Sequence, residues 1–103
     1  TCTAVNIEAL RSRAPDSAAL GKYAEVAGIL YNRSFTSHEA AWDALVNLLA
    51  EWTSLLDLPQ LGDYGLEQCG LDHVVAHSRG RSMKTNPLVL TDEEIKTCLQ
   101  ERL

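Results

Sequence analysis

A stripe of large apolar side chains, recurring every three or four positions between Ser37 and Leu56, constrains the fold of this chain most strongly. That spacing places the stripe on one face of a long α-helix, so we expect this helix to form the core. Thr36 and Glu39 have the spacing of a capping box, which predicts that Thr36 caps the first turn. The stripe consists of Trp42, Leu45, Val46, Leu49, Trp52 and Leu56, widened by Leu48 and Leu55.

The remainder of the chain shows the same helical periodicity, interrupted by short breaks. Between the long helix and the next one, Pro59, Gly62 and Gly65 predict an irregular connection. The sequence therefore predicts an all-α fold, a compact bundle of about five helices in a single domain of residues 1–103. The other expected helices span about residues 1–13, 17–31, 67–78 and 92–102.

A short basic loop separates the last two predicted helices. Gly80 permits backbone angles that other residues avoid, and Pro87 pushes Asn86 out of the α region. Thr91 and Glu94 then form a predicted capping box for the last helix. Loops held between helices often carry function, whereas a solvated connector is an equally weighted alternative. The titratable basic side chains of this region are His77, Arg79, Arg81 and Lys84.

A second group of chemically active side chains lies in the fourth predicted helix. Cys69, His73 and His77 are spaced four residues apart, which would align them on one helical face as zinc ligands. Gly70 weakens that helix, however, and no fourth ligand is evident in the sequence. We therefore expect these residues to be structural and not to bind a metal.

Charge and cysteine content narrow the classes of partner and compartment. The chain has 14 acidic and 9 basic residues, a balance that disfavours nucleic acid as a partner. No apolar run approaches the roughly 20 residues that cross a membrane, and we expect no membrane partner. The three cysteines, Cys2, Cys69 and Cys98, are far apart in the sequence, which favours reduced thiols in the cytoplasm.

Three segments resemble iron-containing (group III) alcohol dehydrogenases. Residues 80–95, GRSMKTNPLVLTDEEI, resemble the stretch that closes those chains, with Asn-Pro followed by Leu-Thr-Asp/Glu-Glu and a last short helix. Residues 22–27, KYAEVA, and residues 56–65, LDLPQLGDYG, resemble two segments found upstream of it. The three matches occur in the family's order and at about its spacings, so the resemblance covers nearly the whole chain.

The resemblance implies that the chain is the C-terminal helical part of a two-domain enzyme with the dehydroquinate synthase-like fold. The parent reaction would be NAD(P)-dependent, metal-assisted hydride transfer between an alcohol and an aldehyde or ketone. In the family, the dinucleotide loop and the metal ligands, one Asp and three His, lie upstream of the matched part. We therefore expect no catalytic, cofactor-binding or metal-binding residue here, an inactive isolated chain, and the absent N-terminal dinucleotide-binding domain as its partner. The parent would use NAD(P) and a divalent metal, iron or zinc.

The same resemblance places the basic loop near the cleft between the two domains. It implies that Arg81, Ser82, Met83 and Lys84 form a wall or anion contacts of the substrate cleft, while Asn86 fixes the loop. Many members have Arg directly after Asn-Pro, where this chain has Leu88, so the substrate class stays open.

A small helical interaction module without catalytic activity is the alternative function. The absence of every catalytic ligand favours this alternative, and the length and order of the family match oppose it. Its docking face would expose Leu48, Leu55 or Trp52 to another protein. A homodimer is another way to cover apolar positions that the absent domain would otherwise bury.

Overall fold

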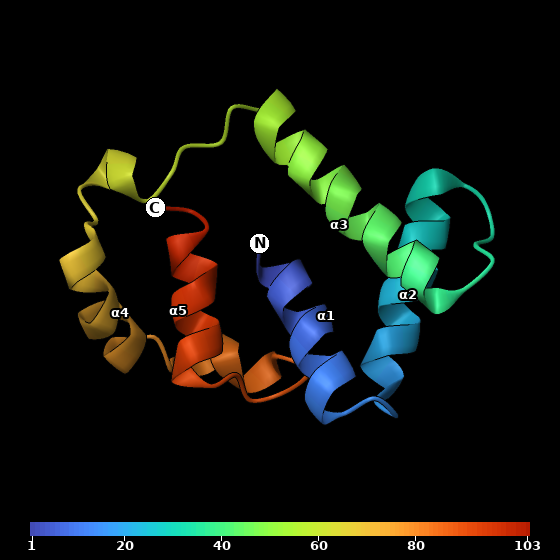
Figure 1. The fold of residues 1–103 in the computed structure, drawn as a ribbon, viewed down its shortest axis with the longest axis horizontal. Helices are drawn as coiled ribbons and strands as arrows, with labels where there is room; N and C mark the ends of the chain where they lie inside the picture. Colours follow the sequence, from blue (N-terminus) through green and yellow to red (C-terminus); the bar gives the residue numbers. More distant parts are fainter. The chain divides into compact units, whose positions relative to one another are not determined.

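The computed structural model describes residues 1–103 and contains five α-helices and no β-strand (Figure 1). The predicted all-α class and the number of helices are confirmed. No helix is both long and apolar enough to span a membrane. The helices are α1 (Cys2–Arg13), α2 (Ala18–Tyr31), α3 (His38–Leu55), α4 (Leu71–His77) and α5 (Asp92–Gln100), with short 3-10 turns at η1 (Gly62–Tyr64), η2 (Gln68–Gly70) and η3 (Arg81–Thr85).

Internal contacts divide the chain into two compact units. One unit comprises Ile7–Leu58, with most of α1 and all of α2 and α3. The other combines Thr1–Asn6 with Pro59–Leu103, so it contains the first turn of α1 together with α4 and α5. The second unit is thus assembled from segments at opposite ends of the sequence.

Capping residues define both ends of α2. The Ser17 hydroxyl oxygen accepts a hydrogen bond from the Ala19 amide at 3.3 Å. At the other end, Asn32 adopts the left-handed conformation, with φ of 51°, and the Arg33 amide donates to the Gly28 carbonyl at 3.1 Å. A Cβ on Gly28 would lie 3.2 Å from the Arg33 carbonyl oxygen, so a glycine suits this close approach.

The predicted cap of α3 is wrong by one residue. Ser37, and not Thr36, is the N-cap, and its hydroxyl accepts from the Ala40 amide at 3.1 Å. Both residue types are good caps, and the oxygen of either can satisfy the amide three positions later. Because the helix starts at His38, Ser37 occupies the position from which its oxygen reaches that amide.

Trp42 lies at the centre of the unit Ile7–Leu58. Its side chain is buried, and its indole Nε1 donates to the Leu20 carbonyl oxygen at 2.9 Å. The Arg11 guanidinium carbon lies 5.5 Å from the centroid of the Trp42 ring, in cation–π range. Trp42 therefore connects α1, α2 and α3. The buried apolar residues of this unit are Ile7, Ala9, Leu10, Leu20, Ala24, Ala27, Ala41, Trp42 and Leu45.

The second half of the apolar stripe on α3 is not buried, contrary to the prediction. Trp52 is 41% exposed, Leu55 78% and Leu56 67%. The two side-chain hydrogen bonds between α2 and α3 reach only the first half of α3, at Trp42 and at the Ala44 carbonyl oxygen. Helical periodicity identifies the face that a neighbour would cover, but it does not say how much of that face a neighbour covers.

The capping box of α5 is confirmed. The Glu94 amide donates to the Thr91 hydroxyl at 3.2 Å, and the Thr91 amide donates to the Glu94 carboxylate at 2.7 Å. Lys96 on α5 bridges to Asp72 on α4 at 2.5 Å, and this hydrogen bond raises the pKa of Lys96. The buried apolar residues of the unit formed by Thr1–Asn6 and Pro59–Leu103 are Val5, Leu71, Val75, Leu90 and Ile95.

The end of the chain is bound to the irregular connection that follows α3. The Leu61 amide donates to the Arg102 carbonyl at 2.7 Å, and the Gly62 amide donates to Leu103 at 3.2 Å. A Cβ on Gly62 would lie only 2.6 Å from the Leu103 carbonyl oxygen. This position requires glycine because the backbone approaches it so closely.

Candidate functional site

The loop between α4 and α5 contains a short 3-10 helix, η3 (Arg81–Thr85). Asn86 is extended, with φ of −63° and ψ of 143°, as its position before Pro87 predicts. Gly80 does not use the conformational freedom of glycine: it adopts an ordinary extended conformation, with φ of −80° and ψ of −168°. A Cβ at Gly80 would meet nothing within 4 Å, so the loop does not require glycine at this position.

Arg79 joins the two ends of this loop. Its guanidinium Nη1 donates to the Leu90 carbonyl oxygen at 3.0 Å, and its Nη2 pairs with the carboxylate of Asp92. Asp92 is the first residue of α5, so the ion pair fixes the exit from α4 against the start of the last helix. The sequence showed Arg79 only as one of several basic residues, without its partner.

Asn86 anchors the middle of the same segment. Its amide Nδ2 donates to Asn6 Oδ1 at 2.8 Å and to the Leu88 carbonyl at 2.9 Å, while Asn6 Nδ2 donates back to Asn86 Oδ1 at 3.0 Å. Asn6, on α1, is only 7% exposed and is the one buried polar residue of the chain. The geometry agrees with a loop-fixing function for Asn86. Sequence reasoning missed Asn6 because its partner lies 80 positions away.

A small cavity of about 170 Å³ lies against this anchored loop. Two of the predicted cleft residues, Met83 and Lys84, line it, whereas Arg81 and Ser82 are exposed on η3 outside the lining. The side chains of Arg81 and Lys84 make no hydrogen bond or ion pair within the chain, so both charges are available to a ligand. The cavity is lined by Arg79, Gly80, Met83, Lys84, Val89 and Leu90.

These side chains combine an apolar surface with positive charge. Met83, Val89 and Leu90 can contact a hydrocarbon group, and Lys84 can pair with an anionic end of the same molecule. Arg79 contributes less to such a ligand because Asp92 already neutralises it. The site can therefore bind and orient, but it contains no evident nucleophile or acid–base pair.

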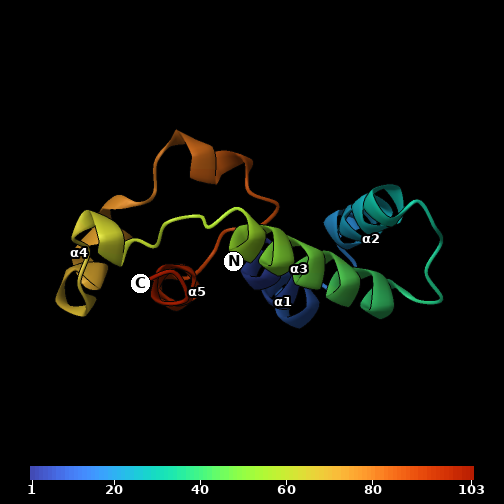
Figure 2. The same ribbon diagram turned by 90° about the horizontal axis from the view of Figure 1, so that it is seen from above.

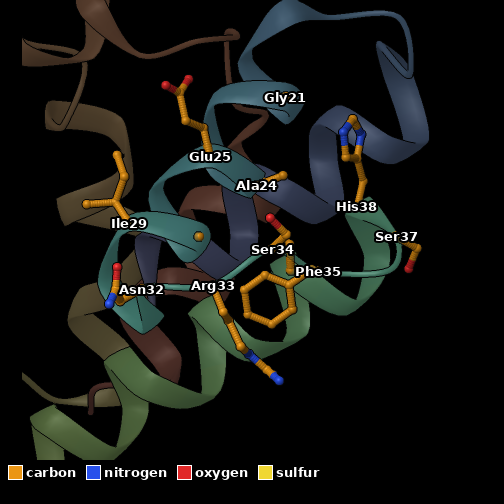
Figure 3. A pocket seen from close by; sticks show the side chains of 12 residues that line it. Gly21, Ala24, Glu25, Ile29, Asn32, Arg33, Ser34, Phe35, Ser37 and His38 are labelled. Carbon is orange, nitrogen blue, oxygen red and sulfur yellow. The ribbon is translucent and has the colours of Figure 1, made fainter.

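A larger and more open hollow, of about 690 Å³, lies in the unit Ile7–Leu58 (Figure 3). The side of the hollow formed by α2 carries the small residues Gly21, Ala24 and Gly28. Glu25 extends from α2 and His38 from α3, on different sides of the hollow. The Arg33 guanidinium stacks 4.5 Å from the Phe35 ring centroid. No pattern in the sequence predicted this hollow. It is lined by Gly21, Ala24, Glu25, Gly28, Ile29, Asn32, Arg33, Ser34, Phe35, Ser37, His38 and Ala41.

The predicted helix over residues 67–78 is shorter than expected. Cys69 lies in the 3-10 turn η2, and α4 begins only at Leu71, so Cys69 does not share a continuous α-helical face with His73 and His77. The two imidazole rings lie 4.3 Å apart, and His77 Nδ1 is 2.8 Å from the His73 carbonyl oxygen. No three His, Cys, Asp or Glu side chains are grouped closely enough to hold a metal ion.

No protein-family model, curated protein or solved structure matches this chain.

Proposed function

We propose that this chain is the C-terminal helical part of an oxidoreductase similar to iron-containing alcohol dehydrogenases, with the corresponding portion of the dehydroquinate synthase-like fold. The parent enzyme would transfer hydride between an alcohol and NAD(P), forming an aldehyde or ketone. The observation that carries the proposal is residues 80–95, in which a family-like sequence coincides with an anchored loop followed by a capped helix.

The residues of that motif have distinct physical tasks, which supports the proposal. Pro87 keeps Asn86 extended, Asn86 binds the buried Asn6, and Thr91 with Glu94 begins the helix. The partner in this proposal is an N-terminal dinucleotide-binding domain, and the compartment is the cytoplasm.

The loop between the anchors forms part of the wall of the substrate cleft in this proposal. Lys84 and Arg81 supply the positive charge, Met83 supplies apolar surface, and Ser82 supplies a hydroxyl. A fixed cation orients an anionic substrate more strongly than a neutral one. Leu88 stands where many family members have Arg, so the chain lacks any contact made by that Arg.

The metal and the nucleotide belong to the absent upstream part in this proposal. The residues present do not fit a metal site, because the His and Cys side chains closest in sequence do not form a group of three ligands. We accordingly assign no chemical step to this chain. The contribution of this chain is to position the substrate.

Sequencing the transcript upstream of the Thr1 codon tests whether the chain belongs to a two-domain parent.

An open reading frame that continues upstream into a dinucleotide-binding domain with a glycine-rich phosphate loop is the expected result. An in-frame stop codon followed by a start codon immediately before the Thr1 codon would overturn the proposal. That result would leave the interaction module as the surviving candidate.

The isolated chain is expected to be catalytically inactive. It would be mixed with NAD or NADP, a panel of alcohols, and ferrous or zinc ion, while the absorbance of the reduced cofactor is followed. We expect no change above the protein-free blank, because the chain has no dinucleotide loop or matched metal ligand. Turnover that co-purifies with the chain through successive columns would contradict the assignment as a partial enzyme.

Replacing Arg81 and Lys84 by Ala should leave the stability of this chain nearly unchanged. Both side chains are exposed and unpaired, and such changes usually alter the free energy of unfolding by no more than about 0.5 kcal/mol. In the full-length polypeptide, the double variant should lose kcat/KM mainly for anionic substrates.

Lys22→Ala is the matched control for that experiment, because it removes one exposed positive charge from α2, in the other unit. Kinetics of the Arg81/Lys84 double variant that equal those of the wild type for neutral and anionic substrates would make the loop a solvated connector.

The interaction module is the second candidate, and the exposed end of α3 favours it. Trp52, Leu55 and Leu56 present contiguous apolar surface, while Leu48 is half-buried. If this surface joins two copies, sedimentation should show a concentration-dependent dimer that Leu55→Asp abolishes. A monomer at all concentrations would exclude the homodimer.

A further inference from the structure

Two cysteines from opposite ends of the sequence meet in the unit formed by Thr1–Asn6 and Pro59–Leu103. The first turn of α1 runs beside α5 in both ribbon views (Figures 1 and 2). Cys2 on α1 and Cys98 on α5 are free thiols, and Cys2 lies close enough to Cys98 to raise the pKa of the Cys98 thiol. In the sequence, 96 positions separate them, so no local pattern indicates that they are neighbours.

A separate contact holds the first turn of α1 against the segment that contains α5. Cys2 and Asn6 lie one turn apart on the same face of α1, and Asn6 is bonded to Asn86 just before α5. On α5, Cys98 follows the buried Ile95 by three residues, so it lies on the face directed into this unit. The amide pair therefore holds the α1 face that carries Cys2 against the C-terminal segment.

We propose that Cys2 and Cys98 are a redox pair that closes to an intramolecular disulfide when the chain meets a low-molecular-weight disulfide such as glutathione disulfide. The proposal concerns this chain alone and does not depend on the proposed dehydrogenase function. In a reducing cytoplasm the two thiols stay reduced, as the sequence analysis expects, and oxidising conditions join them.

The reaction proceeds by two thiol–disulfide exchanges. The exposed Cys2 thiol loses its proton to solvent, and its thiolate attacks one sulfur of glutathione disulfide, which releases one glutathione as thiolate. Cys98 then loses its proton and attacks the Cys2 sulfur, and the second glutathione leaves as the mixed disulfide breaks. Two protein thiols are oxidised, and one glutathione disulfide is reduced to two glutathione molecules.

The environment of Cys98 sets the order of these steps. Burial, and after it the neighbouring Cys2, together raise the pKa of Cys98 to about 12. Cys98 is therefore a protonated thiol at neutral pH, and Cys2 reacts first. Once Cys2 is in the mixed disulfide, its negative charge is gone, so one cause of the raised pKa disappears when Cys98 must ionise.

Closing this disulfide should stabilise the unit. The cross-link would join residues near the two ends of the described chain, so it restricts the unfolded state over almost the whole sequence. The unit otherwise depends on noncovalent contacts to keep Thr1–Asn6 beside Pro59–Leu103. We expect the oxidised chain to melt at least about 5 °C above the reduced chain.

The pairing is tested by oxidising the reduced chain with glutathione disulfide and digesting it with trypsin without reductant. Mass spectrometry should find the peptide Thr1–Arg11, which contains Cys2, linked to the peptide Thr97–Arg102, which contains Cys98. Reductant should separate the two peptides. This digest uses the wild-type chain, so its result does not depend on whether any variant folds.

Cys69→Ser is the matched control, and it should keep both the linked peptide and the increase in melting temperature. Cys2→Ser should lose both. A disulfide through Cys69, a covalent dimer, or glutathione retained on Cys2 without closure would each overturn the proposal.

Discussion

Replacing Trp42 by Ala is expected to reduce the free energy of unfolding by about 3–5 kcal/mol, the usual cost of truncating a buried tryptophan. Trp42 is 7% exposed, and its indole donates a hydrogen bond to the Leu20 carbonyl oxygen. The variant loses packing shared by three helices. A small domain with a stability of about 5–15 kcal/mol would lose a large share of it.

Trp52→Ala is the matched control, because it removes the same side chain from the same helix. With 41% of its surface exposed, Trp52 should contribute no more than about 1 kcal/mol. Urea denaturation followed by far-ultraviolet circular dichroism gives both values. Equal costs for the two replacements would mean that the last turns of α3 are as well covered as the first.

The two tryptophans show what helical periodicity can predict. The three- and four-residue spacing predicted a longest helix over about residues 37–56, which the structure confirms as His38–Leu55, and it correctly placed Trp42 in the core. It also placed Trp52 there, incorrectly. Periodicity defines a face of a helix, but the length over which a neighbour covers that face depends on tertiary packing.

The start of α4 shows a different limit of prediction from the sequence. Its predicted start at Glu67 is wrong because Glu67 is extended, with φ of −112°, and the α-helix begins at Leu71. Gly70 has a low helix propensity, and a Cβ there would lie 3.2 Å from a methyl carbon of Leu66. The local sequence contained the propensity signal, whereas the close approach of Leu66 required the structure.

The candidate site was predictable where it depended on neighbouring residues. The effect of Pro87 on Asn86 and the capping box of Thr91 follow from local chemistry, and both are confirmed. The partner of Asn86 was not predictable, because a hydrogen bond across 80 positions leaves no pattern in a single sequence. The proximity of Cys2 and Cys98 was not predictable for the same reason.

Asn86→Ala is expected to reduce the free energy of unfolding by about 1–3 kcal/mol, because it leaves the amide of Asn6 buried without its partner. Asn6 is 7% exposed, and both of its side-chain hydrogen bonds run to Asn86. Chemical denaturation measures the loss. Hydrogen exchange should also be faster in the loop of residues 80–90, since Asn86 additionally donates to the Leu88 carbonyl oxygen.

A double-mutant cycle separates this pairing from a general effect of removing asparagine. Asn6→Ala and Asn86→Ala together should cost less than the sum of the single changes, with a coupling of about 1 kcal/mol or more, because the second replacement removes the group that the first left unsatisfied. Asn47→Ala, at an exposed position on α3, is the control and should be nearly neutral. Strictly additive costs for the pair would show that the two amides do not bind each other, and the loop would then need a different anchor.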